Sequence, residues 1–210
     1  MTQTKNELRR YTDILSVIDT LRNKRITLVN PERWNDRNDR HTLELYAKRK
    51  CVESVVAYCM TAAPETAHHW QLFAGDAFGV CVVFKRDEFI DHIASQEGVR
   101  CEAVEYWTLS ELEDNKPVPL DKLPFIKRAA FEAEAEVRVI ADHDPKANGP
   151  TRPIHIPLGL IKRVVFSPFA IRALTDTARE VLSGFKGCGK LQFSNSALMN
   201  NQRWRRGTGE

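Results

Sequence analysis

The 210-residue chain lacks the features that mark several classes of protein. Its first ten residues, MTQTKNELRR, contain no apolar core of the kind found in a secretory signal. No stretch approaches the roughly 18 consecutive apolar residues of a membrane-spanning helix. The five cysteines are widely spaced without a C-x-x-C pair, which argues against a zinc ribbon or a disulfide framework. We therefore expect a cytoplasmic protein with reduced thiols and no membrane partner.

A strong charge of one sign is also missing. The 31 Lys and Arg exceed the 28 Asp and Glu by only +3, less than is usual for a nucleic-acid-binding domain. With 42% hydrophobic and 28% charged residues, the composition is that of an ordinary globular protein. We expect one domain over residues 1–198. The basic tail at 199–210 is expected either to be disordered or to act as an interaction arm.

Helical and strand patterns are mixed along the chain without a regular β-α-β alternation. β-branched and apolar runs predict strands at 8–12, 26–30, 53–61, 78–84, 101–107, 136–142, 161–166 and 191–194. Apolar stripes and capping residues predict helices at 12–25, 41–51, 63–75, 86–96, 125–135 and 170–187. Polar and proline-rich stretches predict surface loops at 31–39, 110–124 and 142–153. The fold class is therefore α+β, with a mostly antiparallel sheet or sheets flanked by helices.

Charged residues alternate in the segment FEAEAEVRV, which runs from Phe131 to Val139. Four of them, Glu132, Glu134, Glu136 and Arg138, would share one face of a strand, where the three like charges repel unless a helix continues to about Glu134 and separates them. One interpretation is a solvated edge strand, in which Glu136 and Arg138 form a surface pair of little energetic weight. The other is a carboxylate at the mouth of a cleft, with Arg138 fixing its rotamer. Both remain open at this point.

Several aromatic residues lie close to polar ones. Trp70 and Phe73 are three residues apart on a predicted short helix and would share a face. We expect Phe73 in the core, whereas Trp70 fits either the core or a wall on which a ring-bearing ligand stacks. Tyr11, beside Arg10 at the end of a strand, has the same two interpretations. No spacing of His, Cys, Asp or Glu requires a metal site, and none is predicted.

Several segments together resemble a bacterial family known as domain-of-unknown-function family 2971. The chain has LRRYTDI and VNPERWNDRND where that family has a strand, a helix and a strand ending in N-P-x-x-x-N-D. Trp70 and Gly79 match its W…G spacing, with Phe73 in place of a Tyr. Lys127 and the residues of F-x-x-E-x-E-x-R match in turn, and IKRVVFSP matches a late strand. The resemblance covers roughly residues 8–198, although AYCMT stands where members often have S-F-S.

The layout of that family is similar in outline to the ADP-ribosyltransferase fold. The similarity implies an enzyme that cleaves the nicotinamide–ribose bond of NAD and modifies nucleic acid or protein, as a toxin or in phage defence. Glu136 or Glu134, with Arg138, would then be catalytic. The residues implied in binding NAD are Arg10, Tyr11, Thr12, Trp70, Asn35 and Asp36. The PERWND loop would line the site, or else form a turn in which Asn35 and Asp36 bond their own backbone.

Two other functions are compatible with the sequence. The first is a non-catalytic nucleic-acid-binding module, in which phosphates pair with cations and bases stack on aromatic rings. Its residues would be Arg33, Arg37 and Trp34, together with Arg22, Lys24, Arg25, Arg203, Arg205, Arg206 and Trp204. The second is a metal-dependent nuclease, which would use Asp36 and Asp39 with Glu134 or Glu136. It needs at least two of these carboxylates on one cation.

Overall fold

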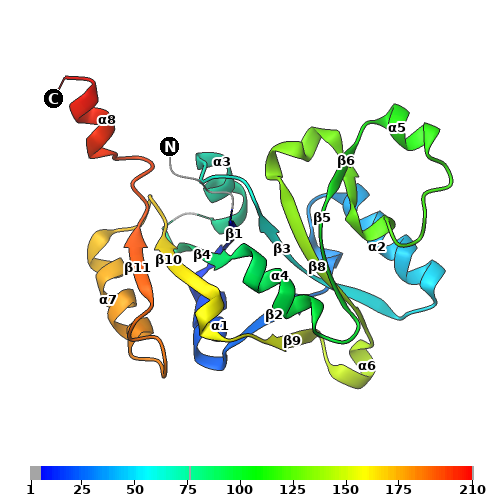
Figure 1. Ribbon diagram of the computed structural model, residues 1–210, viewed down its shortest axis with the longest axis horizontal. Helices are drawn as coiled ribbons and strands as arrows, with labels where there is room; N and C mark the ends of the chain where they lie inside the picture. The colour runs from blue at the N-terminus through cyan, green and yellow to red at the C-terminus, as the bar shows by residue number, and fades with distance from the viewer. Residues whose placement is uncertain (1–5, 76, 210) are drawn as a thin grey trace. The chain divides into compact units, whose positions relative to one another are not determined.

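The computed structural model describes residues 6–75 and 77–209, which form two compact units (Figure 1). Unit 1 comprises residues 1–24, 64–85 and 157–210, and unit 2 comprises residues 25–63 and 86–156. Each unit contains helices and strands, and the strands pair mostly antiparallel. This confirms the predicted α+β class. The prediction of one domain over residues 1–198 stays a prediction.

In unit 1, the strands β11, β10, β4 and β1 follow one another. β10 pairs antiparallel with β4 and parallel with β11, and β1 pairs antiparallel with β4, where Tyr11 lies opposite Cys81. α1 and the π-helix η2 both contact β1 and β4. The elements are β1 Glu7–Asp13, α1 Ile14–Asn23, α3 Ala67–His69, η2 Trp70–Ala74, β4 Gly79–Lys85, η5 Leu158–Leu160, β10 Ile161–Phe166, α7 Arg172–Ser183, β11 Gln192–Asn195 and α8 Gln202–Gly207.

Unit 2 has an antiparallel sheet in which β5, β8, β3, β2 and β9 follow one another, and a small parallel pair, β6 and β7. α2 packs on β3 and β7 over a core that includes Leu43, Tyr46 and Phe125. The elements are β2 Arg25–Val29, η1 Pro31–Arg33, α2 Arg37–Lys50, β3 Ser54–Thr61, α4 Arg86–Ala94, β5 Val99–Ala103, β6 Glu105–Trp107, α5 Leu109–Asp114, η3 Leu123–Phe125, β7 Ile126–Arg128, η4 Ala129–Glu134, β8 Glu136–His143, α6 Pro145–Asn148 and β9 Thr151–His155.

Several local predictions are corrected by the structure. α2 begins at Arg37, four residues before the predicted helix, because Asp36 caps it. The segment 125–135, predicted to be one helix, instead forms the strand β7 and the 3-10 helix η4. The predicted loops at 110–124 and 142–153 contain α5 and α6, each started by a side-chain cap, and β9. Within the expected tail, Gln202–Gly207 forms α8.

Trp70 and Phe73 do not share a face. Trp70 is fully buried, whereas Phe73 is 44% exposed. The expected core position of Phe73 is therefore wrong. The physical reason is that η2 is a π-helix, in which residues three apart are turned further from one another than in an α-helix.

Among the described residues, none of the helices has the length and apolar character needed to cross a bilayer. All five cysteines are free.

Candidate active site

The predicted segment around Glu136 forms a cluster of five charged side chains in unit 2. The residues of this carboxylate cluster are Asp39, Lys127, Glu134, Glu136 and Arg138. All are almost completely buried, and Glu134 has the most exposed side chain, at 12%. A solvated edge strand with a surface pair is therefore excluded. Three carboxylates face two cations, so the cluster has a formal charge of −1 if all five groups are ionised.

Arg138 joins α2 to β8. Its side chain is 0% exposed, and its two terminal nitrogens, Nη1 and Nη2, donate to Oδ1 and Oδ2 of Asp39 at 2.9 and 2.7 Å. Its Nε donates to Oε1 of Glu136 at 2.8 Å, and Nη1 also donates to the backbone oxygen of Pro124 at 2.8 Å. This forked geometry is the strongest form of an arginine–carboxylate contact. Arg138 therefore holds Asp39 and Glu136 in fixed positions.

The sequence NDRND places Asp39 in the first turn of α2. Oδ1 of Asp36 accepts from the backbone nitrogens of Asn38 and Asp39 at 2.9 and 3.4 Å, which starts the helix. Asp39 then points inward to Arg138, and the Trp34 ring lies 5.1 Å from the guanidinium carbon. The loop that ends at Asp39 is thus both an Asx-capped turn and one wall of the cluster.

Lys127 is the second cation of the cluster. Its Nζ lies 2.6 Å from Oε2 of Glu134 and 3.2 Å from Oε2 of Glu136, and 3.6 Å from Oδ2 of Asp39. It also lies 5.0 Å from the centre of the Phe131 ring. Lys127 is not among the predicted site residues, although the resemblance to family 2971 includes it. The pairing of Lys127 with the glutamates could have been found from that motif.

The backbone turns sharply between the two glutamates. Ala135 has a left-handed conformation (φ 43°, ψ 50°), which is uncommon for a residue with a side chain and costs roughly 1–2 kcal/mol. The hydroxyl of Thr61 donates to the backbone oxygen of Glu134 at 2.6 Å, and the backbone nitrogen of Glu136 donates to the Tyr106 hydroxyl at 2.7 Å. The turn at Ala135 lies between η4 and β8. With the chain turned there, the carboxylates of Glu134 and Glu136 both contact Lys127.

The two glutamates differ in protonation behaviour. Burial alone would raise the pKa of Glu136, but Arg138 and Lys127 outweigh it and hold that pKa at about 2. Burial raises the pKa of Glu134, and the neighbouring Glu136 adds to the rise against the opposing effect of Lys127. A pair of carboxyls whose pKa values are pushed apart is typical of acid–base sites. Glu136 is held as an anion, whereas burial raises the pKa of Glu134 and also that of Asp39.

The remaining predicted residues of unit 2 lie at the start of α2. Asn35 and Arg37 are exposed, and the side chain of Arg33 lies outside the described residues. Asp36 uses Oδ1 for capping, while its Oδ2 is buried and accepts no hydrogen bond from the described residues. Trp34 packs against Arg138 and the core of unit 2, so it is half-buried. Ligand contacts by these residues stay predictions.

Unit 1 contains the other predicted residues. Arg10 and Thr12 are half-buried on β1. Tyr11 is 3% exposed; its ring stacks on His69 at 5.4 Å and meets Trp70 edge-on at 5.0 Å. Trp70 is 0% exposed, and its Nε1 donates to Oε1 of Glu65 at 2.8 Å. This favours the core interpretation for Tyr11 and Trp70, and binding of NAD by either residue stays a prediction.

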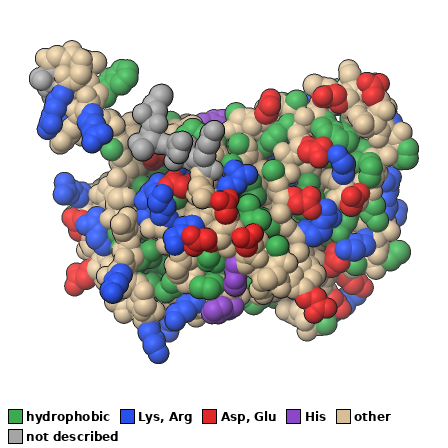
Figure 2. Space-filling model, in the orientation of Figure 1, with side chains coloured by type: hydrophobic (Ala, Val, Ile, Leu, Met, Phe, Trp, Pro, Cys, Tyr) green, Lys and Arg blue, Asp and Glu red, His purple; other side chains and the backbone are tan. Residues whose placement is uncertain are grey.

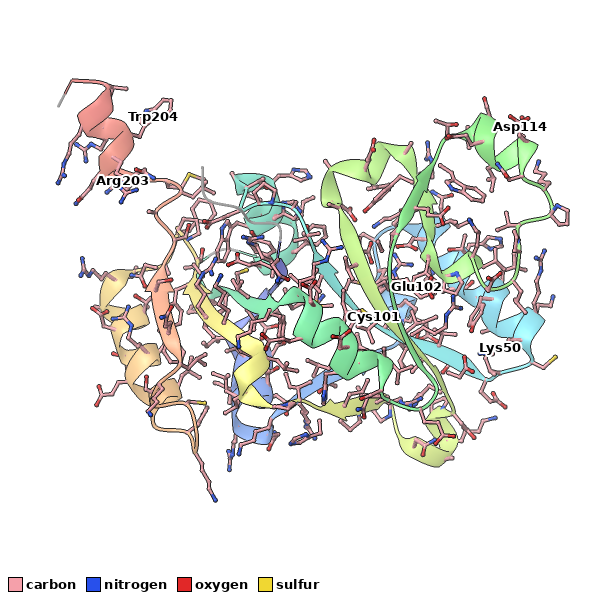
Figure 3. The ribbon with its side chains drawn as sticks, in the orientation of Figure 1. Lys50, Cys101, Glu102, Asp114, Arg203 and Trp204 are labelled. Carbon is pink, nitrogen blue, oxygen red and sulfur yellow. The ribbon has the colours of Figure 1, made fainter. Side chains whose placement is uncertain are left out.

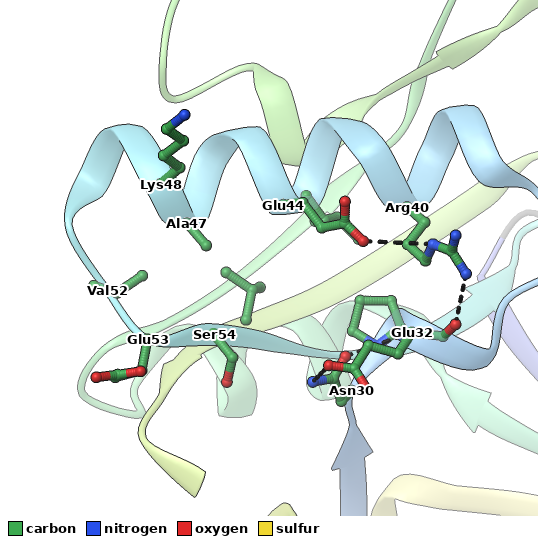
Figure 4. Close-up of a pocket in the computed structure, with 12 residues that line it drawn as sticks. Asn30, Glu32, Arg40, Glu44, Ala47, Lys48, Val52, Glu53 and Ser54 are labelled. Atoms are coloured by element: carbon green, nitrogen blue, oxygen red, sulfur yellow. Dashed lines mark hydrogen bonds and ion pairs between the residues drawn. The ribbon is translucent and has the colours of Figure 1, made fainter.

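A pocket of about 270 Å³ lies in unit 2 between α2, η1 and the start of β3 (Figure 4). Within its lining, Arg40 lies 3.4 Å from Glu44 and donates to the backbone oxygen of Glu32 at 2.8 Å. None of the cluster residues lines it. The pocket therefore supplies no chemistry to the carboxylate cluster.

A metal-dependent nuclease finds no support in this arrangement. The positions between the carboxylates of the cluster are taken by the ammonium of Lys127 and the guanidinium of Arg138. Across residues 6–75 and 77–209, no group of three or more His, Cys, Asp or Glu is arranged to hold a metal ion.

Among solved structures, DarT from Thermus sp. 2.9 in complex with ADP-ribosylated ssDNA is similar to this chain. The TM-score is 0.47 at 9% sequence identity, over 93% of this chain and 96% of that one. A likeness at that TM-score says nothing about chemistry, which has to be inferred from the side chains. The chain matches no protein-family model and no curated protein sequence. Membership of family 2971 therefore stays a prediction.

Proposed function

We propose that the chain is an ADP-ribosyltransferase-like enzyme that cleaves the nicotinamide–ribose bond of NAD, with Glu134 as the carboxylate that acts on the ribose. The observation that carries the proposal is that two neighbouring glutamates differ in exposure, in their partners and in the direction in which their pKa values are shifted. Glu136 is held as an anion by Arg138 and Lys127, whereas Glu134 is the outermost acid of the cluster and has a raised pKa. Perturbed carboxyls of this kind concentrate at functional sites.

The reaction needs a carboxylate beside the sugar. As the bond from the ribose carbon to the nicotinamide nitrogen breaks, the electron pair leaves with nicotinamide and positive charge develops on the ribose. An anionic Glu134 would stabilise that charge and hold a ribose hydroxyl, as carboxylates do in glycosidic cleavage generally. An acceptor nucleophile then bonds to the ribose carbon and releases its proton to water. Lys127, which contacts Glu134 at 2.6 Å, would hold the carboxylate in place.

Glu136 is the weaker candidate for direct contact with the substrate. Both of its oxygens are engaged, Oε1 by Arg138 and Oε2 by Lys127, and its backbone nitrogen is bound to Tyr106. Withdrawing a carboxylate from two buried cations would leave uncompensated charge, which is strongly unfavourable. In this proposal Glu136 and Arg138 are positioning residues, and Glu134 alone touches the ribose.

NAD would be the substrate, and no residue of unit 1 has a demonstrated part in holding it. Arg10 remains the proposed ligand for the pyrophosphate, because a guanidinium can form forked contacts with phosphate oxygens. The acceptor is proposed to be nucleic acid or protein. Single-stranded DNA and a mixture of proteins are the two acceptors to test.

The proposal is tested by nicotinamide release from NAD, measured for the wild type, Glu134→Gln and Glu132→Gln. Glu132 is exposed and lies two residues away, so it is a matched control for loss of a negative charge. We expect Glu134→Gln to bind NAD in calorimetry but to lose roughly 100- to 1,000-fold in rate, as for loss of one transition-state contact. Glu132→Gln should match the wild type.

Two results would contradict the proposal. One is a wild-type rate in Glu134→Gln; the other is a wild-type protein that neither binds millimolar NAD nor releases nicotinamide. Thermal unfolding of each variant shows whether a lost rate reflects lost structure. Arg10→Ala, tested in the same assay, should weaken NAD binding without removing the bond-breaking step at saturating NAD.

A further inference from the structure

The modest net charge of the chain conceals a strong difference between its units. Unit 1 has 15 Lys and Arg against 8 Asp and Glu, a formal charge of +7, whereas unit 2 has 16 against 20, a formal charge of −4. Together they give the +3 of the whole chain. Clustered positive charge is what attracts polyanions over a distance and through direct contacts. The positive excess therefore favours unit 1 over unit 2 as the place where a polyanion binds.

The most exposed aromatic side chain of unit 1 lies inside a group of cations. α8 has the sequence QRWRRG, started by Asn201, whose side chain accepts from the backbone nitrogens of Arg203 and Trp204 at 3.0 and 3.1 Å. Trp204 is 74% exposed. Arg203 and Trp204 are both carried by α8 (Figure 3), and the space-filling view shows blue side chains and a green one on this helix, with tan atoms between them (Figure 2).

We propose that α8 binds single-stranded nucleic acid. Trp204 would stack on an unpaired base, and Arg203 and Arg206, which are three residues apart and share a face of the helix, would pair with phosphates of the same strand. Burying an indole against a base removes apolar surface from water at little cost in conformational freedom, and every base offers a face on which it can stack. The inference concerns binding alone, and it stands or falls separately from NAD cleavage.

The arrangement of α8 favours nucleic acid over a lipid surface. A membrane-binding helix needs an apolar face along its length. α8 has only six residues, and at 100° per residue its three arginines are distributed around the helix, so that Trp204 is its single large apolar group. An acidic protein could pair with the arginines, but it would leave the indole without a specific partner. A single-stranded nucleic acid offers phosphates to the arginines and a base to the indole.

The test is fluorescence anisotropy with a labelled single-stranded oligonucleotide of about ten nucleotides, within the usual site sizes for such proteins. The full-length variants are Trp204→Ala, the double variant Arg203→Gln with Arg206→Gln, and Arg172→Gln. Arg172 is the matched control, because it lies on α7 of the same unit with an 88% exposed side chain. All changed side chains are exposed, so folding should be unaffected, and circular dichroism melts check this.

We expect Trp204→Ala to weaken binding roughly fivefold to a hundredfold, as for loss of one stacked base. The double variant should lower the slope of log affinity against log salt by about 1.4, since each phosphate contact on a single strand contributes roughly 0.7. Arg172→Gln should have a much smaller effect. The wild type should also bind a duplex of the same sequence more weakly, because its bases are already stacked.

The proposal is overturned by any of four results. These are no measurable binding of the oligonucleotide, an equal loss in Arg172→Gln and in the double variant, equal affinity for duplex and single strand, or tighter binding to vesicles of phosphatidylserine and phosphatidylcholine than to the oligonucleotide. An equal loss in Arg172→Gln would mean that the oligonucleotide is attracted to unit 1 as a whole, and tighter binding to vesicles would mean that α8 is a membrane-binding arm.

Discussion

Each unit contains one group of buried, paired charges, and the two groups have opposite imbalances. In unit 1, Glu7 accepts from three cations: Arg9 at 2.6 Å, Lys162 at 2.7 Å and Arg163 at 2.7 Å. In the carboxylate cluster of unit 2, three carboxylates share the cations Lys127 and Arg138. The first group has an excess of two positive charges and the second an excess of one negative charge.

The two groups differ in whether the side chains that carry the excess charge are exposed to water. In unit 1 the excess positive charge lies on Lys162 and Arg163, whose side chains are 50% and 28% exposed, so water hydrates them. Glu7 stays ionised, with a pKa of about 2, chiefly because Arg163 donates a hydrogen bond to it. In the carboxylate cluster the excess is buried, and the pKa of Glu134 rises instead. A buried excess of carboxylates thus creates a group poised to change protonation, whereas an exposed excess of cations does not.

The largest effect that separates the two groups should come from removing an arginine. Arg138→Met leaves the three buried carboxylates with Lys127 as their one cation, and we expect a loss of roughly 3–5 kcal/mol in the free energy of unfolding. Arg163→Met is the control, because Glu7 keeps Arg9 and Lys162; we expect a loss of about 1 kcal/mol or less. Urea denaturation measures both. Equal losses would mean that the two groups do not differ in the way described.

Acid should destabilise the protein through carboxylates with depressed pKa values. Glu136 has a pKa of about 2 in the folded protein against an ordinary 4.5, so its contribution is complete above pH 4.5 and is lost as the pH falls towards 2. Its size is on the order of 3 kcal/mol. Glu134, whose pKa is raised, acts in the opposite direction and gains stability when it becomes protonated. Denaturation at pH 6, 4.5 and 3 should show a flatter dependence for Glu136→Gln than for Glu132→Gln.

The chemistry-bearing segment of unit 2 could be predicted from the sequence, but its contacts could not. The alternation of Glu134, Glu136 and Arg138 identifies the correct segment, because closely spaced charges of both signs on an otherwise apolar strand are unusual. The partner of Arg138 is Asp39, 99 residues earlier in the chain. Local spacing contains no information about a pairing at that separation.

Local propensity gives the wrong prediction around Lys127. The run FIKRAAFEAEA is rich in helix-forming residues, yet β6 pairs with Ile126–Arg128 and makes a strand of it. Strand pairing therefore overrides helix propensity at Lys127, and this places the Lys127 ammonium between the carboxylates. The left-handed Ala135 is equally hidden, since alanine gives no signal for that conformation. Composition and periodicity are enough to predict the fold class. The pattern of apolar residues reflects which side of a helix or strand is buried, and it is visible in the sequence for both kinds of element.

Lys127→Met should sharpen the contrast between the two glutamates. The substitution removes the cation that opposes the rise of the pKa of Glu134. If Glu134 acts as an anion in the proposed reaction, the acidic limb of the rate profile for nicotinamide release should move to higher pH. Lys122→Met is the control, because Lys122 pairs with the exposed Glu105 instead. A profile that falls in height without moving along the pH axis would show that Lys127 does not set the protonation of the reacting group.

The smallest expected effect concerns Trp34, the tryptophan that lies among charged residues in the PERWND loop. Its ring lies 5.1 Å from the guanidinium carbon of Arg138, so it should stabilise the buried cation by roughly 0.5–1 kcal/mol beyond its packing. Trp34→Phe keeps an aromatic face and Trp34→Leu does not, and the difference in their free energies of unfolding isolates this contribution. The same pair in Arg138→Met should show no such difference, because the cation is gone. If the two variants are equally stable but both weaken binding of the single-stranded oligonucleotide, Trp34 belongs to a nucleic-acid surface and not to the wall of the carboxylate cluster.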